Sequence, residues 1–229
     1  MIPVDSICVA LDTPDLGRAC DLASALAGEA GWFKVGLTLY GAHGPAAVDR
    51  IASCGGRVFL DLKLHDIPVQ VAGAVAAAAD LGASLLTVHA SGGPSMLASA
   101  AAARKNGIKV VAVTVLTSIS GDELGAIWPG QEPQQAVTRL TSLAVDAGLD
   151  GVVMSPREVA AMRGLVPPGF LFVVPGIRPV DSGVKGQDDQ ARTGDPQSVY
   201  GAGANILVVG RPITHADDPV VAARRIRGA

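Results

Sequence analysis

The chain has 229 residues, a length that fits either two small domains or one barrel and that can bury a large core. Hydrophobic residues make up 49% of the chain and aromatic residues only 3%, a balance typical of buried strands packed against Ala-rich helices. The net charge of −3 and the scattered Lys and Arg residues exclude an extended basic surface, so we expect no nucleic-acid partner.

The N-terminal residues and the cysteines indicate a cytoplasmic protein. The first residues, MIPVDSICVALD, have no basic region and no cleavage site, and they look like a strand. No apolar run approaches the roughly 20 residues needed to span a bilayer, so we expect no membrane contact. Cys8, Cys20 and Cys54 are an odd number with no metal-like spacing, as expected in a reducing compartment.

Apolar runs typical of strands alternate with helical patterns along the chain. Strands are expected at 7–11, 32–36, 58–60, 85–88, 109–116, 151–154, 170–174 and 205–209. Helices are expected at 16–26, 46–52, 69–81, 94–106, 134–147 and 219–226, with a short helical piece in 120–130. This alternation has no composition break, so it predicts one (β/α)8 TIM barrel over 1–229. A doubly wound open sheet is the alternative, but no G-x-G-x-x-G follows the first strand.

Polar side chains appear where the expected strands end. They are Asp12, Lys34, Asp61 with Lys63, His89, Thr117, Ser155, Arg178 and Arg211. Because active sites of TIM barrels lie at the C-terminal ends of the strands, we expect these side chains to surround one mouth. Asp61 and Lys63 are two residues apart, so a continuing strand would point both the same way. For this D-x-K pattern taken alone, a solvated ion pair is the alternative.

The segments after the last two strands predict a phosphate site and a lid. The eighth strand ends at Gly210-Arg211-Pro212, which offers a backbone N–H and a guanidinium to phosphate oxygens; a plain turn is the alternative for Gly210. The polar stretch 179–196 has the length of a functional lid, with disorder without a role as the alternative. No metal site is expected, because no carboxylate or cysteine lies at ligand spacing from His43, His65 or His215.

The stretch DLKLHDIP at 61–68 resembles the signature of the orotidine 5′-phosphate decarboxylase family. Further segments similar to this family follow in order over nearly the whole chain: ALD at 10–12, FKVG at 33–36, VHASGG at 88–93, PGIRP at 175–179, DDQAR at 188–192 and VGRPIT at 209–214. The resemblance implies a TIM barrel that converts orotidine 5′-monophosphate to UMP and CO2 in pyrimidine synthesis. It also implies that the reaction needs no cofactor.

The resemblance also implies roles for individual residues. Lys63 would protonate C6 of the pyrimidine within a charged array that includes Lys34 and Asp61. Asp66 would complete the array in the active site of the partner subunit of a homodimer. The implied substrate-binding residues are Asp12 and Lys34 at the ribose, Thr117 near the pyrimidine, Gln190, Gly210 and Arg211 at the phosphate, Arg178 at the base of a lid over about 178–196, and also Asp61 and Ile67. Because the stretch after Arg178 is longer than in the family, Gln187 is the alternative to Gln190.

Two other functions fit a barrel with these residues. Sugar-phosphate decarboxylases and aldolases of the same superfamily also use a D-x-K strand, but they require magnesium and carry an acidic residue where this chain has Lys34. A non-catalytic nucleotide-binding barrel has no need to place Lys34, Asp61 and Lys63 at one mouth. The chemistry favours a decarboxylase, because a carbanion formed without a cofactor as electron sink needs a positive charge from the protein.

Overall fold

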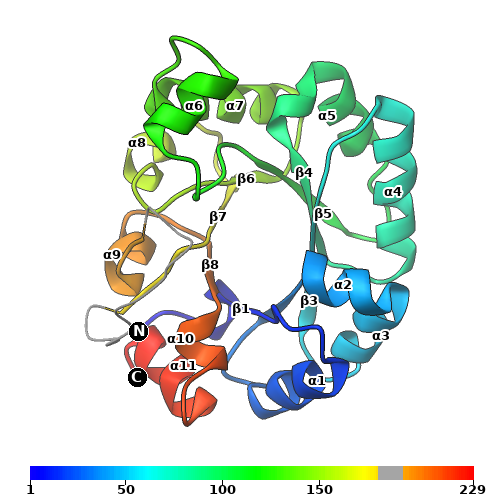
Figure 1. The fold of residues 1–229 in the computed structure, drawn as a ribbon, viewed down its shortest axis with the longest axis vertical. Coiled ribbons are helices and arrows are strands. Elements are labelled where there is room, and N and C mark those ends of the chain that lie inside the picture. The colour runs from blue at the N-terminus through cyan, green and yellow to red at the C-terminus, as the bar shows by residue number, and fades with distance from the viewer. Residues whose placement is uncertain (180–192) are drawn as a thin grey trace.

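The computed structural model describes residues 1–179 and 193–229, and within them parallel strands β1 to β8 close into a barrel in sequence order (Figure 1). Pairing of β1 with β8 completes the ring. The predicted TIM barrel is therefore confirmed, and the alternative of an open sheet is wrong. The strands are β1 Ile7–Ala10, β2 Trp32–Gly36, β3 Arg57–Leu64, β4 Leu85–His89, β5 Lys109–Val113, β6 Gly151–Val153, β7 Leu171–Val174 and β8 Ile206–Val209.

Helices surround the barrel on the outside (Figure 1). They are α1 Leu16–Ala25, α2 Leu37–His43, α3 Pro45–Ala52, α4 Pro68–Asp80, α5 Gly93–Ala102, α6 Gly121–Ile127, α7 Pro133–Asp146, α8 Val159–Arg163, α9 Pro196–Gly201, α10 Arg211–Thr214 and α11 Pro219–Arg227, with 3-10 turns η1 Val4–Ser6 and η2 Ala90–Gly92. Proline opens α3, α4, α7 and α11, where its missing N–H costs no hydrogen bond. None of the described helices combines the length and apolarity that crossing a membrane requires.

Strands β3 and β5 differ most in length from the sequence prediction, and both differences shape the mouth of the barrel. Strand β5 ends at Val113 and not at 116, and the residues that follow, Val115 and Leu116, line the mouth. Strand β3 continues beyond residue 60, because its ladder with β4 resumes at Leu64 after a shift of register. The charged segment after Leu60 is therefore held inside the sheet.

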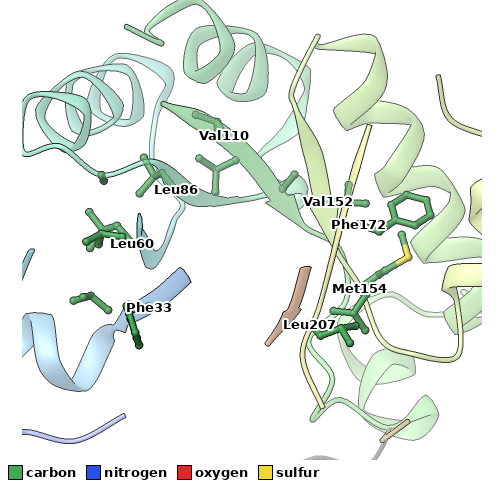
Figure 2. Close-up of a cluster of buried hydrophobic side chains, with 14 of the residues drawn as sticks. Phe33, Leu60, Leu86, Val110, Val152, Met154, Phe172 and Leu207 are labelled. Atoms are coloured by element: carbon green, nitrogen blue, oxygen red, sulfur yellow. The ribbon is translucent and has the colours of Figure 1, made fainter. Parts of the chain in front are cut away.

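The apolar residues form two clusters, one between the strands and the helices and one inside the barrel. Figure 2 shows part of the outer cluster, in which Phe33 of β2, Leu60 of β3 and Leu86 of β4 are almost fully buried. The inner cluster consists of Cys8, Ala10, Trp32, Phe59, Leu85, Val111, Val173, Ile206 and Val208, with Val153 packed against it. Small and branched residues predominate in both clusters, which suits the low aromatic content of the chain.

Strand alternation brings a polar layer into the barrel directly above the inner cluster. Successive side chains of a strand point to opposite faces, so residues two apart share a face. Two residues after Trp32, Phe59 and Leu85 in β2, β3 and β4 come the buried polar residues Lys34, Asp61 and Thr87. Three neighbouring strands therefore place an ammonium, a carboxylate and a hydroxyl at one level.

Candidate active site

A cavity of about 520 Å³ opens at the carboxyl ends of the strands. Its deeper wall is apolar and includes Ala10, Phe59 and Val208. The volume falls in the range of pockets that hold a small molecule. Most of the site residues expected from the sequence line this one cavity: Asp12, Lys34, Asp61, Lys63, Thr117, Arg178, Gly210 and Arg211. His89 and Ser155, which are also expected at the mouth, do not line it.

Four charged side chains of the cavity form a continuous chain of alternating sign. Lys34 Nζ lies 2.7 Å from Asp12 Oδ1 and 3.5 Å from Asp61 Oδ2. Lys63 Nζ lies 2.8 Å from the same Asp61 oxygen. Asp61 and Lys34 are only 8% and 9% exposed, so both charges have lost most of their water. Two ammonium groups around one carboxylate compensate for that loss.

Burial and charge act in opposite directions on the pKa values of this buried pair. Burial raises the pKa of Asp61, but the two lysines and its hydrogen bonds outweigh burial and hold the pKa below its usual value. Burial lowers the pKa of Lys34, but Asp61 and Asp12 outweigh it and hold the pKa above its usual value. Both groups are therefore charged at neutral pH.

The backbone at Lys63 is irregular, although Asp61 and Lys63 lie side by side as their spacing predicts. Lys63 has a φ of 51°, a left-handed conformation that is uncommon for a residue with a side chain. The β3–β4 ladder passes from Leu60 opposite Leu86 to Leu64 opposite Val88, so the segment 61–63 stands opposite Thr87 alone. The regular strand alternation that we expected between Asp61 and Lys63 is therefore wrong.

Thr87 and Gly36 also belong to the site, although the sequence predicts no role for either residue. Thr87 Oγ1 lies 2.9 Å from Asp61 Oδ1 and 2.9 Å from the backbone nitrogen of Lys63. A Cβ atom on Gly36 would lie 2.8 Å from Lys34 Nζ and 3.0 Å from Asp12 Oδ1. The alternation of side chains along β4 could have placed Thr87 inside the barrel. The close approach of the Lys34 and Asp12 side chains to Gly36 cannot be recognised from the neighbouring sequence.

Other expected site residues lie apart from this cavity. Asp66 and Ile67 are exposed on the turn between β3 and α4 and do not line it, and Asp66 Oδ1 accepts a hydrogen bond of 2.6 Å from the N–H of Ile67. Gln190 and its alternative Gln187 lie outside the described residues, as does most of the stretch 179–196. In the described part of the chain, no three His, Cys, Asp or Glu side chains gather as a metal site would require.

Comparisons with known proteins identify the family of this chain. Residues 5–226 match the Orotidine 5′-phosphate decarboxylase / HUMPS family. A relative from Anaeromyxobacter sp. (strain K), named orotidine 5′-phosphate decarboxylase, is 52% identical over 99% of this chain and 98% of its own. One with the same name from Moorella thermoacetica is 48% identical over 97% of this chain and 90% of its own. The crystal structure of orotidine 5′-phosphate decarboxylase from Lactobacillus acidophilus superposes with a TM-score of 0.85 at 34% identity, covering 98% of each chain. The chain thus belongs to the orotidine 5′-phosphate decarboxylase / HUMPS family.

Proposed function

We propose that this protein decarboxylates orotidine 5′-monophosphate to UMP and CO2, a carboxy-lyase reaction of pyrimidine biosynthesis, without a cofactor. The observation that carries the proposal is the chain of alternating charges in the cavity. Asp61 Oδ2 lies 2.8 Å from Lys63 Nζ and 3.5 Å from Lys34 Nζ, in a member of this family. We place the protein in the cytoplasm, in line with its unpaired cysteines.

Lys63 supplies the charge and the proton that the reaction needs. When the bond from C6 to the carboxylate breaks, its electron pair stays on C6 in the ring plane, where no adjacent carbonyl or imine delocalises it. An ammonium about 4 Å from this carbanion is worth roughly 4 kcal/mol at an effective dielectric constant near 20. Lys63 then transfers its proton to C6, which forms the C–H bond of UMP, and takes a proton back from water.

Asp61 acts on the carboxylate that leaves. Two lysines and a threonine hydroxyl keep Asp61 ionised, so its negative charge repels the carboxylate of a bound substrate. The repulsion falls as that carboxylate becomes neutral CO2, so the reactant is destabilised more than the transition state. This term adds to the attraction between the Lys63 ammonium and the carbanion.

Side chains from the other strands hold the rest of the nucleotide. Asp12 and Lys34, paired at 2.7 Å, bind the ribose hydroxyls, and Thr117 contacts the pyrimidine. Arg178 and Arg211 follow β7 and β8, the strands after which this fold commonly binds phosphate. They bind the 5′-phosphate together with the N–H of Gly210 and the side chain of Gln190, and Ile67 contributes to the binding surface.

Asp66 acts in the active site of a partner subunit in a homodimer. It lies three residues after Lys63, on an exposed turn that does not line its own cavity. Next to Asp66 lie Ile67 and, in the first turn of α4, Val69, which are 61% and 69% exposed. Exposed apolar side chains that gather in this way mark interaction surfaces. In a two-fold pair, the same turn of each subunit comes close to the cavity of the other.

The nearest alternative is a magnesium-dependent sugar-phosphate decarboxylase or aldolase. Lys34 argues against it, because its ammonium lies beside Asp61 where such an enzyme has an acidic residue. The test is an absorbance assay for loss of orotidine 5′-monophosphate, run once with EDTA and once with magnesium. We expect equal turnover in both. Turnover only with magnesium would support the alternative enzyme, and UMP binding without turnover would support a non-catalytic nucleotide-binding barrel.

A further inference from the structure

The Thr87 hydroxyl joins the two central residues of the proposed reaction. The side chain is fully buried, and its Oγ1 lies 2.9 Å from both Asp61 Oδ1 and the backbone nitrogen of Lys63. A backbone N–H can only donate, so the hydroxyl accepts from Lys63. An ionised carboxylate can only accept, so the same hydroxyl donates its proton to Asp61. The direction of both hydrogen bonds is therefore fixed.

This hydroxyl takes the place of a ladder hydrogen bond where the sheet is irregular. The segment 61–63 of β3 stands opposite Thr87 alone, and Lys63 has a left-handed backbone with a φ of 51°. Strain of this kind persists only where the surroundings hold it. The hydrogen bond from the Lys63 N–H to Thr87 is one such restraint, and it aims the ammonium at Asp61, 2.8 Å away.

We propose that Thr87 is a positioning residue for decarboxylation, whose hydroxyl fixes the Asp61 carboxylate and the Lys63 backbone in their reactive arrangement. Thr87 is absent from the lining of the cavity, so it acts through these two neighbours and does not touch the substrate. The inference rests on the proposed function for its kinetic test. A second test below needs no turnover.

The kinetic test compares Thr87→Val, which has the same shape without the hydroxyl, with Thr87→Ser, which keeps the hydroxyl. We expect kcat of the valine variant to fall roughly ten- to hundredfold, the effect of one lost hydrogen bond to a charged group. KM should change little, because the ribose and phosphate contacts come from other strands. The serine variant should recover most of kcat. If the valine variant does not fold, Thr87→Ala replaces it in the same comparison.

Thr114→Val is the matched control. Thr114 is 3% exposed, and its hydroxyl donates to the backbone carbonyl of Val153 at 2.9 Å, away from the charged array. The substitution therefore removes one buried hydroxyl from the barrel without touching Asp61 or Lys63. We expect it to leave kcat unchanged. An equal fall in kcat in both valine variants would reduce Thr87 to a structural role and overturn the inference, as would wild-type kcat in Thr87→Val.

The second test follows hydrogen exchange of the Lys63 amide by NMR, without substrate. We expect this amide to exchange at least about tenfold faster in Thr87→Val than in the wild type, relative to the other β3 amides, and to stay protected in Thr87→Ser. Unchanged exchange in the valine variant would overturn the inference. If wild-type protein does not decarboxylate orotidine 5′-monophosphate, the proposed function fails, and this test still decides whether the hydroxyl holds Lys63.

Discussion

Lys63 combines the proposed chemistry with backbone strain. A left-handed backbone costs a residue with a side chain roughly 1–2 kcal/mol. Asn106 is the other non-glycine residue with a positive φ in the described chain, and it precedes Gly107 in a turn, where asparagine adopts this conformation readily. No such turn accounts for Lys63. In this conformation the Lys63 N–H donates to Thr87 and the ammonium pairs with Asp61.

Lys63→Ala should abolish decarboxylation and leave UMP binding intact, because the ribose and phosphate contacts that we propose do not involve Lys63. The measurements are kcat in the absorbance assay and UMP affinity by titration calorimetry. Lys105→Ala is the control, since Lys105 pairs with Asp80 on the surface, outside the cavity. If Lys63→Ala retained even about a tenth of the wild-type kcat, the assignment of the proton donor would be wrong.

Gly36→Ala should lower kcat/KM at least about tenfold with little change in melting temperature. A new Cβ would meet Lys34 Nζ at 2.8 Å, which is the end of a flexible side chain. The ammonium can move away at little cost in stability, but it then leaves Asp12 and Asp61, and an error of this size is expensive for catalysis. Gly41→Ala in α2 is the control, because its Cβ meets no atom within 4 Å. Wild-type kinetics in Gly36→Ala would contradict the role of Lys34.

At the scale of the helices and strands, local patterns predict most of the barrel. The expected strand 32–36 is β2 as observed, and the expected helix 69–81 is α4 at Pro68–Asp80. Apolar periodicity, glycine and proline mark these elements within a few residues of sequence. The same patterns place polar residues at the strand ends, so the cavity that they line could be expected from the sequence.

The features that the sequence did not predict depend on contacts between distant segments. Helix α2, Leu37–His43, contains Gly41 and has a low intrinsic helix propensity. Its Leu39 side chain is fully buried, so packing against the rest of the protein supports the helix. The left-handed Lys63 depends on the shift of register between β3 and β4. Neither segment carries a local signal for these contacts, so single-sequence patterns missed both.

Helix α7 contains a buried polar group whose removal should stabilise the fold. Among the described residues, Thr141 is buried with a hydroxyl that makes no hydrogen bond. Thr141→Val keeps the shape and removes the desolvated hydroxyl, so we expect the free energy of unfolding to rise by about 1 kcal/mol in urea titrations. Thr138→Val is the control, because its hydroxyl bonds to the Gln134 carbonyl. A loss of stability in Thr141→Val would reveal a partner for its hydroxyl.

At the scale of the whole molecule, the dimer proposal predicts that two inactive variants rescue each other. The Lys63→Ala and Asp66→Asn proteins are prepared separately, unfolded, mixed in equal amounts and refolded together. If Asp66 serves the partner, each mixed dimer contains one intact site and one site with both defects. Random pairing makes half of the dimers mixed, so roughly a quarter of the wild-type activity should return.

The opposite result has an equally clear meaning. If Asp66 serves its own cavity, every site in the mixed dimers keeps one defect, and the mixture stays as inactive as its parents. Gel filtration of the refolded mixture must show dimers for this comparison. A monomeric protein with normal turnover would also rule out a shared site.

The alternating array also determines how the enzyme responds to salt. The two carboxylates and two ammonium groups of the array sum to zero charge. Their electric fields therefore cancel within a few ångströms of the array. This distance is shorter than the screening length of about 8 Å at physiological ionic strength. The array therefore acts only on a substrate that is already bound. The proposed function assigns the nucleotide phosphate to Arg178 and Arg211, which line the same cavity. If that assignment holds, added salt should weaken capture of the phosphate, lower kcat/KM and leave kcat unchanged. An equal fall in kcat would show that ions from solution reach the array.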